Sequence, residues 1–204
     1  MTVVQLKQCM ALPALRFGKI HIYPSAVLLP ALIYFLNAGY FVLLTVIAVI
    51  IHELGHYLTL RLCGGEVKCI KLRISGVSLV FGELGYTGET VTAFAGPLIN
   101  LLLAFAAAAI GRFVSFTPAY HLAGFSLLLA LFNLLPVFPL DGGRVIFALS
   151  AGIFGLGIAE RVRKICAVIV CAAIGLAGAA ILVFYRNPTL FIAAAILTTE
   201  TGEI

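Results

Sequence analysis

The chain has 204 residues, of which 63% are hydrophobic and 10% are charged, and its mean hydropathy is +1.17. This composition excludes an ordinary soluble domain, in which about a quarter of the residues carry charge, and indicates an integral membrane protein. The formal net charge of +5 comes from Lys and Arg residues scattered between apolar segments, without a basic face, so we expect no nucleic-acid partner and attribute the charge to membrane topology.

Apolar runs divide the chain into a series of predicted membrane helices. A crossing needs about 20 apolar residues, and five runs come close to this length. The predicted spans are residues 22–38, 40–62, 91–111, 120–138 and 165–185, with a possible short last span at 188–199. Residues 145–158 are too short to cross and are interrupted by glycines, so we interpret them as a re-entrant or interfacial element. The sequence thus predicts an all-α polytopic membrane protein with about six transmembrane segments in a single domain, residues 1–204.

The basic residues indicate how these spans are oriented. Lys and Arg residues cluster before the first run, after the second and after the fourth, so a cytoplasmic N-terminus places every cluster on the cytoplasmic side. Only Arg112 and Arg186 then fall on the outer side. Counting residues 145–158 as a crossing would move the cluster at 161–164 to the outer side, which favours the re-entrant interpretation. We therefore expect a multi-pass cell membrane protein with a cytoplasmic N-terminus.

Residues 66–82, between the second and third spans, show a different pattern. Side chains alternate in character from Val67 to Ile74, and Gly76 interrupts the alternation, which is typical of short strands. We expect a small β-hairpin or sheet at the cytoplasmic membrane surface, whose unpaired edge would accept an extended peptide as an added strand. A merely structural loop is the alternative interpretation.

The second predicted span contains three groups that are costly to bury, in the stretch HELGH. In a helix, His52 and His56 project from one face about 6 Å apart, which suits two imidazoles that bind one metal ion. Glu53 follows the first histidine directly, where its carboxylate can reach a water molecule at the metal. Ionisable groups inside a span are expensive and usually functional, so this stretch indicates a metal site. Since Arg61 marks the cytoplasmic boundary, the helix rise puts His56 roughly 8 Å below it.

A catalytic zinc ion needs a third protein ligand and an open position for water, and the chain contains a single aspartate, Asp141. It lies in the stretch NLLPVFPLDGGR, where Pro136 and Pro139 interrupt a helix and two glycines free the backbone. An irregular segment of this kind can present a carboxylate to a cavity within the membrane. Taken alone, Asp141 would be interpreted as an interfacial partner of Arg144. Beside the histidine pair, we predict that it completes a Zn2+ site.

Three motifs together resemble the site-2 protease family of intramembrane zinc metalloproteases, peptidase family M50. They are HELGH in a membrane helix, AGPLIN at residues 95–100 and NLLPVFPLDGGR at residues 133–144. The stretch KIHIYP at residues 19–24 further resembles the sporulation branch, in which the protease releases a mother-cell sigma factor from its membrane-bound precursor. Many members of that branch carry a CBS domain and other relatives carry PDZ domains; we expect neither in this chain.

Carried over onto the matching positions, the resemblance implies a role for single residues. The implied zinc ligands and catalytic base are His52, His56, Asp141 and Glu53. The resemblance also places two amides near the site, those of Asn100 and Asn133, where they would bind the substrate backbone or stabilise a developing oxyanion. Packing between helices is the alternative role for both amides, since an amide in an apolar setting needs a partner.

We therefore expect an intramembrane zinc endopeptidase that performs regulated proteolysis near the cytoplasmic face. In this chemistry Glu53 takes a proton from the attacking water and returns it to the leaving amine. The expected partners are a membrane-tethered protein substrate, such as a sporulation sigma-factor precursor, the lipid bilayer and membrane regulatory or inhibitory proteins. If the sporulation resemblance holds, the membrane is the one that surrounds the forespore.

Two other classes of function compete with this expectation. A different membrane HExxH protease, such as a prenyl-protein peptidase, would be expected to use a glutamate on a later helix as its third ligand. A metal transporter or a catalytically silent scaffold would need no base beside the first ligand, and a purely structural zinc site would normally have four protein ligands.

Overall fold

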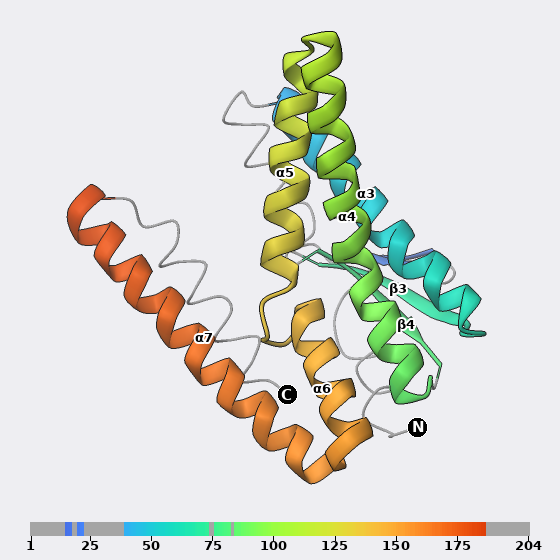
Figure 1. Cartoon of the computed structure of the whole chain (residues 1–204). Helices are drawn as coiled ribbons and strands as arrows, with labels where there is room; N and C mark the ends of the chain where they lie inside the picture. Colours follow the sequence, from blue (N-terminus) through green and yellow to red (C-terminus); the bar gives the residue numbers. More distant parts are fainter. Residues whose placement is uncertain (1–14, 18–19, 23–38, 74–75, 83, 187–204) are drawn as a thin grey trace.

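The computed structural model describes residues 15–17, 20–22, 39–73, 76–82 and 84–186, and these residues are mostly helical (Figure 1). The helices are α3 (Gly39–Leu62), α4 (Tyr86–Val114), α5 (Thr117–Asn133), α6 (Asp141–Phe154) and α7 (Leu156–Tyr185). The strands are β1 (Leu15–Phe17), β2 (Ile20–Ile22), β3 (Val67–Arg73) and β4 (Gly76–Phe81). The predicted first span, apart from its first residue, and the predicted last span lie outside the described residues, so the count of six stays a prediction.

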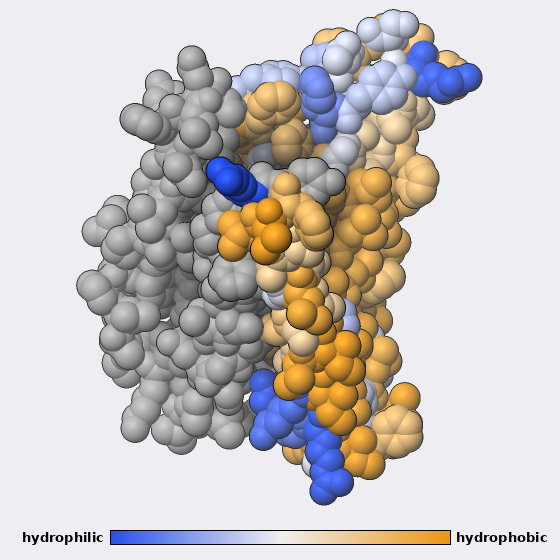
Figure 2. Space-filling model, turned by 90° about the vertical axis from the view of Figure 1, so that its left-hand side faces the viewer, coloured by the Kyte–Doolittle hydropathy of each residue, from blue (hydrophilic) through white to orange (hydrophobic). Residues whose placement is uncertain are grey.

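Helices α3, α4 and α7 are long and apolar enough to cross a membrane, which makes the chain a helical membrane protein. Helix α3 corresponds to the predicted span 40–62. Helix α4 begins at Tyr86, before the predicted start at residue 91, because a hydrogen-bonded helix can extend beyond the apolar run. Its first turn includes Glu89, whose negative charge is favourable beside the free N–H groups of a helix start. Figure 2 shows a broad apolar surface with hydrophilic side chains gathered toward its upper and lower ends.

Helix α5 ends at Asn133, earlier than the predicted span end at residue 138. Pro136 and Pro139 explain the difference, because a proline has no N–H to donate and drives the preceding residue out of the helical region. The chain turns through residues 134–140, with a cis peptide bond between Phe138 and Pro139, and α6 then begins. The irregular segment that the prolines predict therefore lies directly before Asp141.

The segment interpreted as one re-entrant element, residues 145–158, belongs to two helices. Helix α6 ends at Phe154, Gly155 has a φ of +83° that interrupts the helix, and α7 starts at the next residue. Helix α7 therefore begins well before the predicted span 165–185, because the basic residues ahead of that span are themselves helical. Arg163, for example, is paired with Glu160 one turn earlier, at 2.9 Å between Nη2 and Oε2. Whether any part of residues 145–158 enters the membrane stays a prediction.

The strands form one four-stranded sheet in the order β1-β2-β3-β4. Strands β3 and β4 are antiparallel neighbours, with Arg73 opposite Gly76 at the turn, and their register shifts between Val67 and Cys69. Strand β2 pairs in parallel with β3, so the segment before the first predicted span lies beside the segment that follows α3. The position of this sheet at the membrane surface stays a prediction.

Small residues allow α3 and α4 to approach closely. A Cβ atom on Gly55 of α3 would lie 2.7 Å from Cγ2 of Ile99 and 2.9 Å from the carbonyl oxygen of Ala95, both on α4. The buried face of α4 is itself rich in alanine and glycine, as expected where membrane helices associate through close packing. This contact brings the histidine-bearing face of α3 directly against α4.

Candidate metal centre

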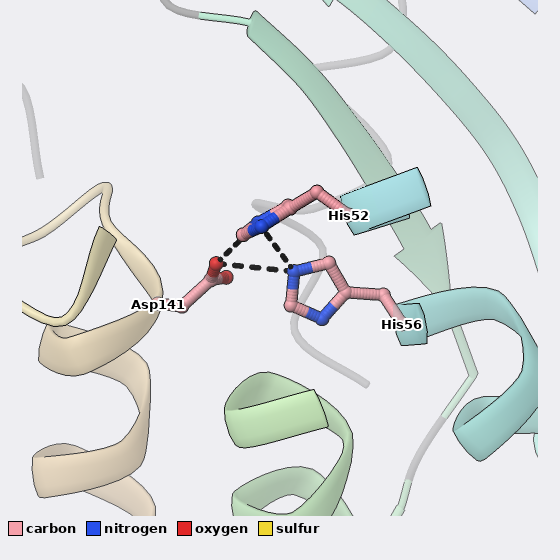
Figure 3. A group of neighbouring side chains, drawn as sticks. All are labelled: His52, His56 and Asp141. Atoms are coloured by element: carbon pink, nitrogen blue, oxygen red, sulfur yellow. Dashed lines mark hydrogen bonds and ion pairs between the residues drawn. The ribbon is translucent and has the colours of Figure 1, made fainter. Parts of the chain in front are cut away.

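His52, His56 and Asp141 come together from two helices that are far apart in the sequence (Figure 3). The two histidines lie one turn apart on α3, and Asp141 is the first residue of α6. All three are buried, with 4%, 5% and 7% of their surface exposed. Oδ2 of Asp141 lies 3.0 Å from Nε2 of each histidine, and the two Nε2 atoms are 3.1 Å apart. The three atoms therefore form a nearly equilateral triangle.

The size and chemistry of this triangle fit a zinc ion. A tetrahedral zinc with bonds of about 2.0–2.1 Å keeps its ligand atoms about 3.3 Å apart, close to the distances observed. Two imidazoles and one carboxylate are a donor set that catalytic zinc sites use, and three protein ligands leave a position for water or substrate. Three electronegative atoms at this separation also need positive charge between them, which ring protons or a metal ion can supply. The residues present therefore match the expected cofactor.

The backbone of α4 orients the ring of His56. Nδ1 of this ring lies 2.7 Å from the carbonyl oxygen of Thr92, and because a carbonyl can only accept, Nδ1 must be the donor. In the neutral ring the lone pair then lies on Nε2, the atom that faces His52 and Asp141. Metal-binding histidines usually donate their second ring nitrogen in this way. This contact could not be predicted from sequence, because any residue type at position 92 offers the same carbonyl group.

Gly96 on α4 also shapes the site. A Cβ atom at this position would overlap Nε2 of His56, so the ring can occupy its place only against a glycine. The following Pro97 is buried as well. Within the AGPLIN stretch, the glycine thus makes room for a predicted metal ligand, which is more specific than a general role in helix packing.

Two further glycines allow α6 to start where it does. A Cβ atom on Gly142 would overlap the carbonyl oxygen of Leu134, and one on Gly143 would lie 2.5 Å from the carbonyl carbon of Val137. Both glycines are within α6, and neither has a positive φ. The interpretation that they free the backbone is therefore wrong: they are small so that the start of the helix can pack against the preceding turn. That packing places the Asp141 carboxylate at the histidines.

The two oxygens of Asp141 face different partners. Oδ2 faces the histidines, whereas Oδ1 lies 3.4 Å from Nη1 of Arg144, one turn along α6. The ion pair that was the alternative interpretation of Asp141 therefore exists beside the histidine contacts. Because the guanidinium occupies Oδ1, it favours the carboxylate orientation in which Oδ2 points into the triangle.

The remaining predicted site residues lie in different surroundings. Glu53 is half-buried, and its carboxylate lies close enough to His56, Asp141 and Arg144 to interact electrostatically with each. Asn100 is fully buried, with Nδ2 at 3.3 Å from Nδ1 of His52. The catalytic role of Glu53 and the substrate-binding role of Asn100 stay predictions.

Asn133 lies at the end of α5, and its amide donates to the carbonyl oxygen of Leu129 in its own helix at 3.0 Å. This hydrogen bond stays within one helix, so the substrate-binding role of Asn133 and its alternative role in packing between helices both stay predictions. The structure thus brings Asn100 against a predicted ligand, and it shows Asn133 in a local contact.

The fold is that of a helical membrane protein, and its buried His–His–Asp group takes two of its three donors from an HExxH stretch. These two features define a membrane protein of the HExxH metal-binding class. Residues 114–177, which include Asp141, match peptidase family M50. The zinc metalloprotease MJ0392 of Methanocaldococcus jannaschii is 31% identical over 119 residues, which cover 55% of this chain and 35% of that protein. Stage IV sporulation protein FB of Bacillus subtilis is 33% identical over 136 residues, which cover 64% of this chain and 47% of that protein.

The fold is also that of a solved relative. The site-2 protease from Methanocaldococcus jannaschii superposes with a TM-score of 0.73 over 94% of each chain, at 21% sequence identity. The predicted resemblance to peptidase family M50 is confirmed over the part of the chain that these proteins match. The chain covers about a third to a half of the length of the two curated relatives.

Proposed function

We propose that the chain is an intramembrane zinc endopeptidase that performs regulated proteolysis of a membrane-tethered protein. The observation that carries the proposal is the triangle of Nε2 of His52, Nε2 of His56 and Oδ2 of Asp141, buried inside a helical membrane frame. Ionisable groups inside a membrane are expensive and mark function. In a chain that matches peptidase family M50, a zinc ion held by this triangle is the simplest reason for their presence.

The proposed reaction is hydrolysis of a peptide bond. Zinc supplies Lewis-acid activation of the water and of the peptide carbonyl. Glu53 takes a proton from the attacking water as the new C–O bond forms, and returns it to the amide nitrogen as the C–N bond breaks. Its position beside His52 in the sequence and its electrostatic proximity to His56 and Asp141 support this role.

The substrate and its location follow from the proposed topology. With the N-terminus in the cytoplasm, the site opens toward the cytoplasmic face, so we expect a substrate with a cytoplasmic segment beside its membrane anchor. The edge of the sheet at β4 could receive an extended segment of this kind by strand addition. Regulatory or inhibitory membrane proteins and the surrounding lipid complete the expected partners.

A sporulation sigma-factor precursor is the more specific substrate that we propose. The 33% identity with stage IV sporulation protein FB of Bacillus subtilis supports it, as does the KIHIYP stretch before the first predicted span. The membrane would then be the one that surrounds the forespore. This narrower proposal can fail while the protease assignment holds.

Replacing Glu53 with Gln tests the proposed chemistry. We would express the wild-type chain and Glu53→Gln with membrane-tethered precursors, map any new N-terminus by mass spectrometry, and measure the zinc content of the purified proteins. Cleavage should disappear in Glu53→Gln while bound zinc remains, because Gln cannot act as a base. Glu160→Gln, which removes an exposed carboxylate at the start of α7, is the matched control and should cleave normally.

The same measurements separate the competing functions. A metal transporter or a silent scaffold would bind zinc and produce no new N-terminus with any precursor. Another type of HExxH protease would retain zinc when Asp141 is replaced with Ala. Unchanged cleavage by Glu53→Gln would contradict the proposed role of that residue.

A further inference from the structure

The two histidines of the triangle differ in what holds their second ring nitrogen. Nδ1 of His56 donates to a backbone carbonyl, which fixes its proton on that atom. Nδ1 of His52 instead faces the side-chain amide of Asn100 at 3.3 Å. An amide has one end that donates and one that accepts, so it can specify either tautomer of the ring that it contacts.

The orientation of the amide decides whether His52 can be a ligand. With Nδ2 of Asn100 toward the ring, Nδ1 must accept, and the proton of the neutral ring lies on Nε2, inside the triangle. A half turn of the amide exchanges its two ends, so that Nδ1–H donates a hydrogen bond to Oδ1 and Nε2 carries the lone pair. Only this second arrangement presents Nε2 of His52 as a metal ligand.

The surroundings of Asn100 permit this half turn. The residue is fully buried, and its Oδ1 has no hydrogen-bond partner among the described residues. A buried acceptor without a partner costs about 1–3 kcal/mol. Turning the amide gives Oδ1 the Nδ1–H group of His52 as its donor, and it moves Nδ2 to the position where Oδ1 had no partner among the described residues.

We propose that Asn100 is a positioning residue whose side-chain carbonyl holds the proton of His52 on Nδ1 and so presents Nε2 to zinc. The inference rests on the proposed function, because it assumes that His52 is a zinc ligand. It assigns to a side chain of α4 the same task for His52 that the Thr92 carbonyl of α4 performs for His56. One helix thereby orients both histidines of α3.

Zinc affinity, measured by competition with a chromophoric chelator, tests this role without reference to activity. Asn100→Leu keeps a similar volume but offers no acceptor, and we expect its zinc affinity to fall about 10- to 100-fold, as for other outer-shell partners of metal-binding histidines. Asn100→Asp keeps an oxygen toward Nδ1, so its affinity should stay at or above the wild-type value. Thr90→Val, on the same helix, is the matched control for zinc binding, because the Thr90 hydroxyl donates to the carbonyl oxygen of Tyr86 in its own helix.

A second measurement reads the tautomer directly and needs no variant. In the zinc-loaded wild-type protein labelled with ¹⁵N-histidine, both histidines of the triangle should carry their proton on Nδ1 and none on Nε2. A zinc-loaded His52 with its proton on Nε2 would overturn the inference, as would an Asn100→Leu protein that binds zinc as tightly as the wild type. By contrast, if His52→Ala binds zinc as tightly as the wild type, the proposed zinc site itself would be overturned.

Discussion

Gly96 on α4 lies against the ring of His56 on α3 so closely that a methyl group at position 96 would overlap Nε2. The ring cannot retreat freely, since Nδ1 is held at 2.7 Å from the Thr92 carbonyl oxygen. A side chain at position 96 must therefore move the proposed zinc-binding atom, separate α3 from α4, or both. Gly96 is thus needed because only a glycine at this position leaves room for the His56 ring.

Gly96→Ala should lower zinc affinity by about 10-fold or more, because loss of an outer-shell partner of a metal-binding histidine already has an effect of this size. The same variant should not cleave. Competition with a chelator on detergent-purified protein measures the first effect. Gly124→Ala is the matched control, because a Cβ atom there meets nothing within 4 Å. Equal zinc affinity in Gly96→Ala and the wild type would show that the ring of His56 is not confined as described.

Gly142→Ala should disturb the site from the opposite side. The added methyl group would overlap the carbonyl oxygen of Leu134, and the start of α6 would have to move with Asp141, the residue before it. We expect weaker zinc binding and a lower unfolding temperature than in the wild type. Gly175→Ala, in a position of α7 with nothing within 4 Å, should show neither effect. Wild-type zinc affinity in Gly142→Ala would mean that Asp141 does not depend on this close packing.

The part of the site that sequence could predict is the part that rests on local rules. Helical spacing places His52 and His56 on one face whatever surrounds the helix. Asp141 could be identified because the chain contains no other aspartate. Pro136 and Pro139 likewise predict the irregular segment before it, since their effect on the backbone is local.

The contacts between helices could not be predicted in the same way. The hydrogen bond from Nδ1 of His56 to the Thr92 carbonyl depends on the register of α3 against α4. A backbone carbonyl is present at every position, so the sequence does not indicate which one accepts. The helix limits were also inaccurate, because hydropathy marks the part of a helix that suits lipid, whereas the hydrogen-bonded helix continues into polar residues. Helix α7 therefore begins at Leu156, well before the predicted span.

Removal of zinc should inactivate and destabilise the protein together. A ligand that binds only the folded state stabilises it, by about 2.7 kcal/mol at a free concentration 100 times its Kd. Chelation should therefore abolish cleavage and lower the unfolding temperature, and added zinc should restore both. His52→Ala provides the control, since its unfolding temperature should not respond to zinc at the same concentration. A wild-type protein that cleaves normally after chelation, with no zinc detected, would contradict the proposed cofactor.

Two exposed positions at opposite ends of α4 can establish the orientation in the membrane. Cys63 lies in the connection that precedes α4, and Ser115 lies in the turn that follows it. Helix α4 has 29 residues, so a rise of about 1.5 Å per residue separates its ends by more than the roughly 30 Å hydrocarbon core. With the other cysteines replaced, a membrane-impermeant thiol reagent added to intact cells should label Ser115→Cys and leave Cys63 unlabelled, whereas inverted vesicles should reverse this result. Labelling of Cys63 in intact cells would place the basic clusters and the proposed site on the outer side, and would exclude a cytoplasmic cleavage site.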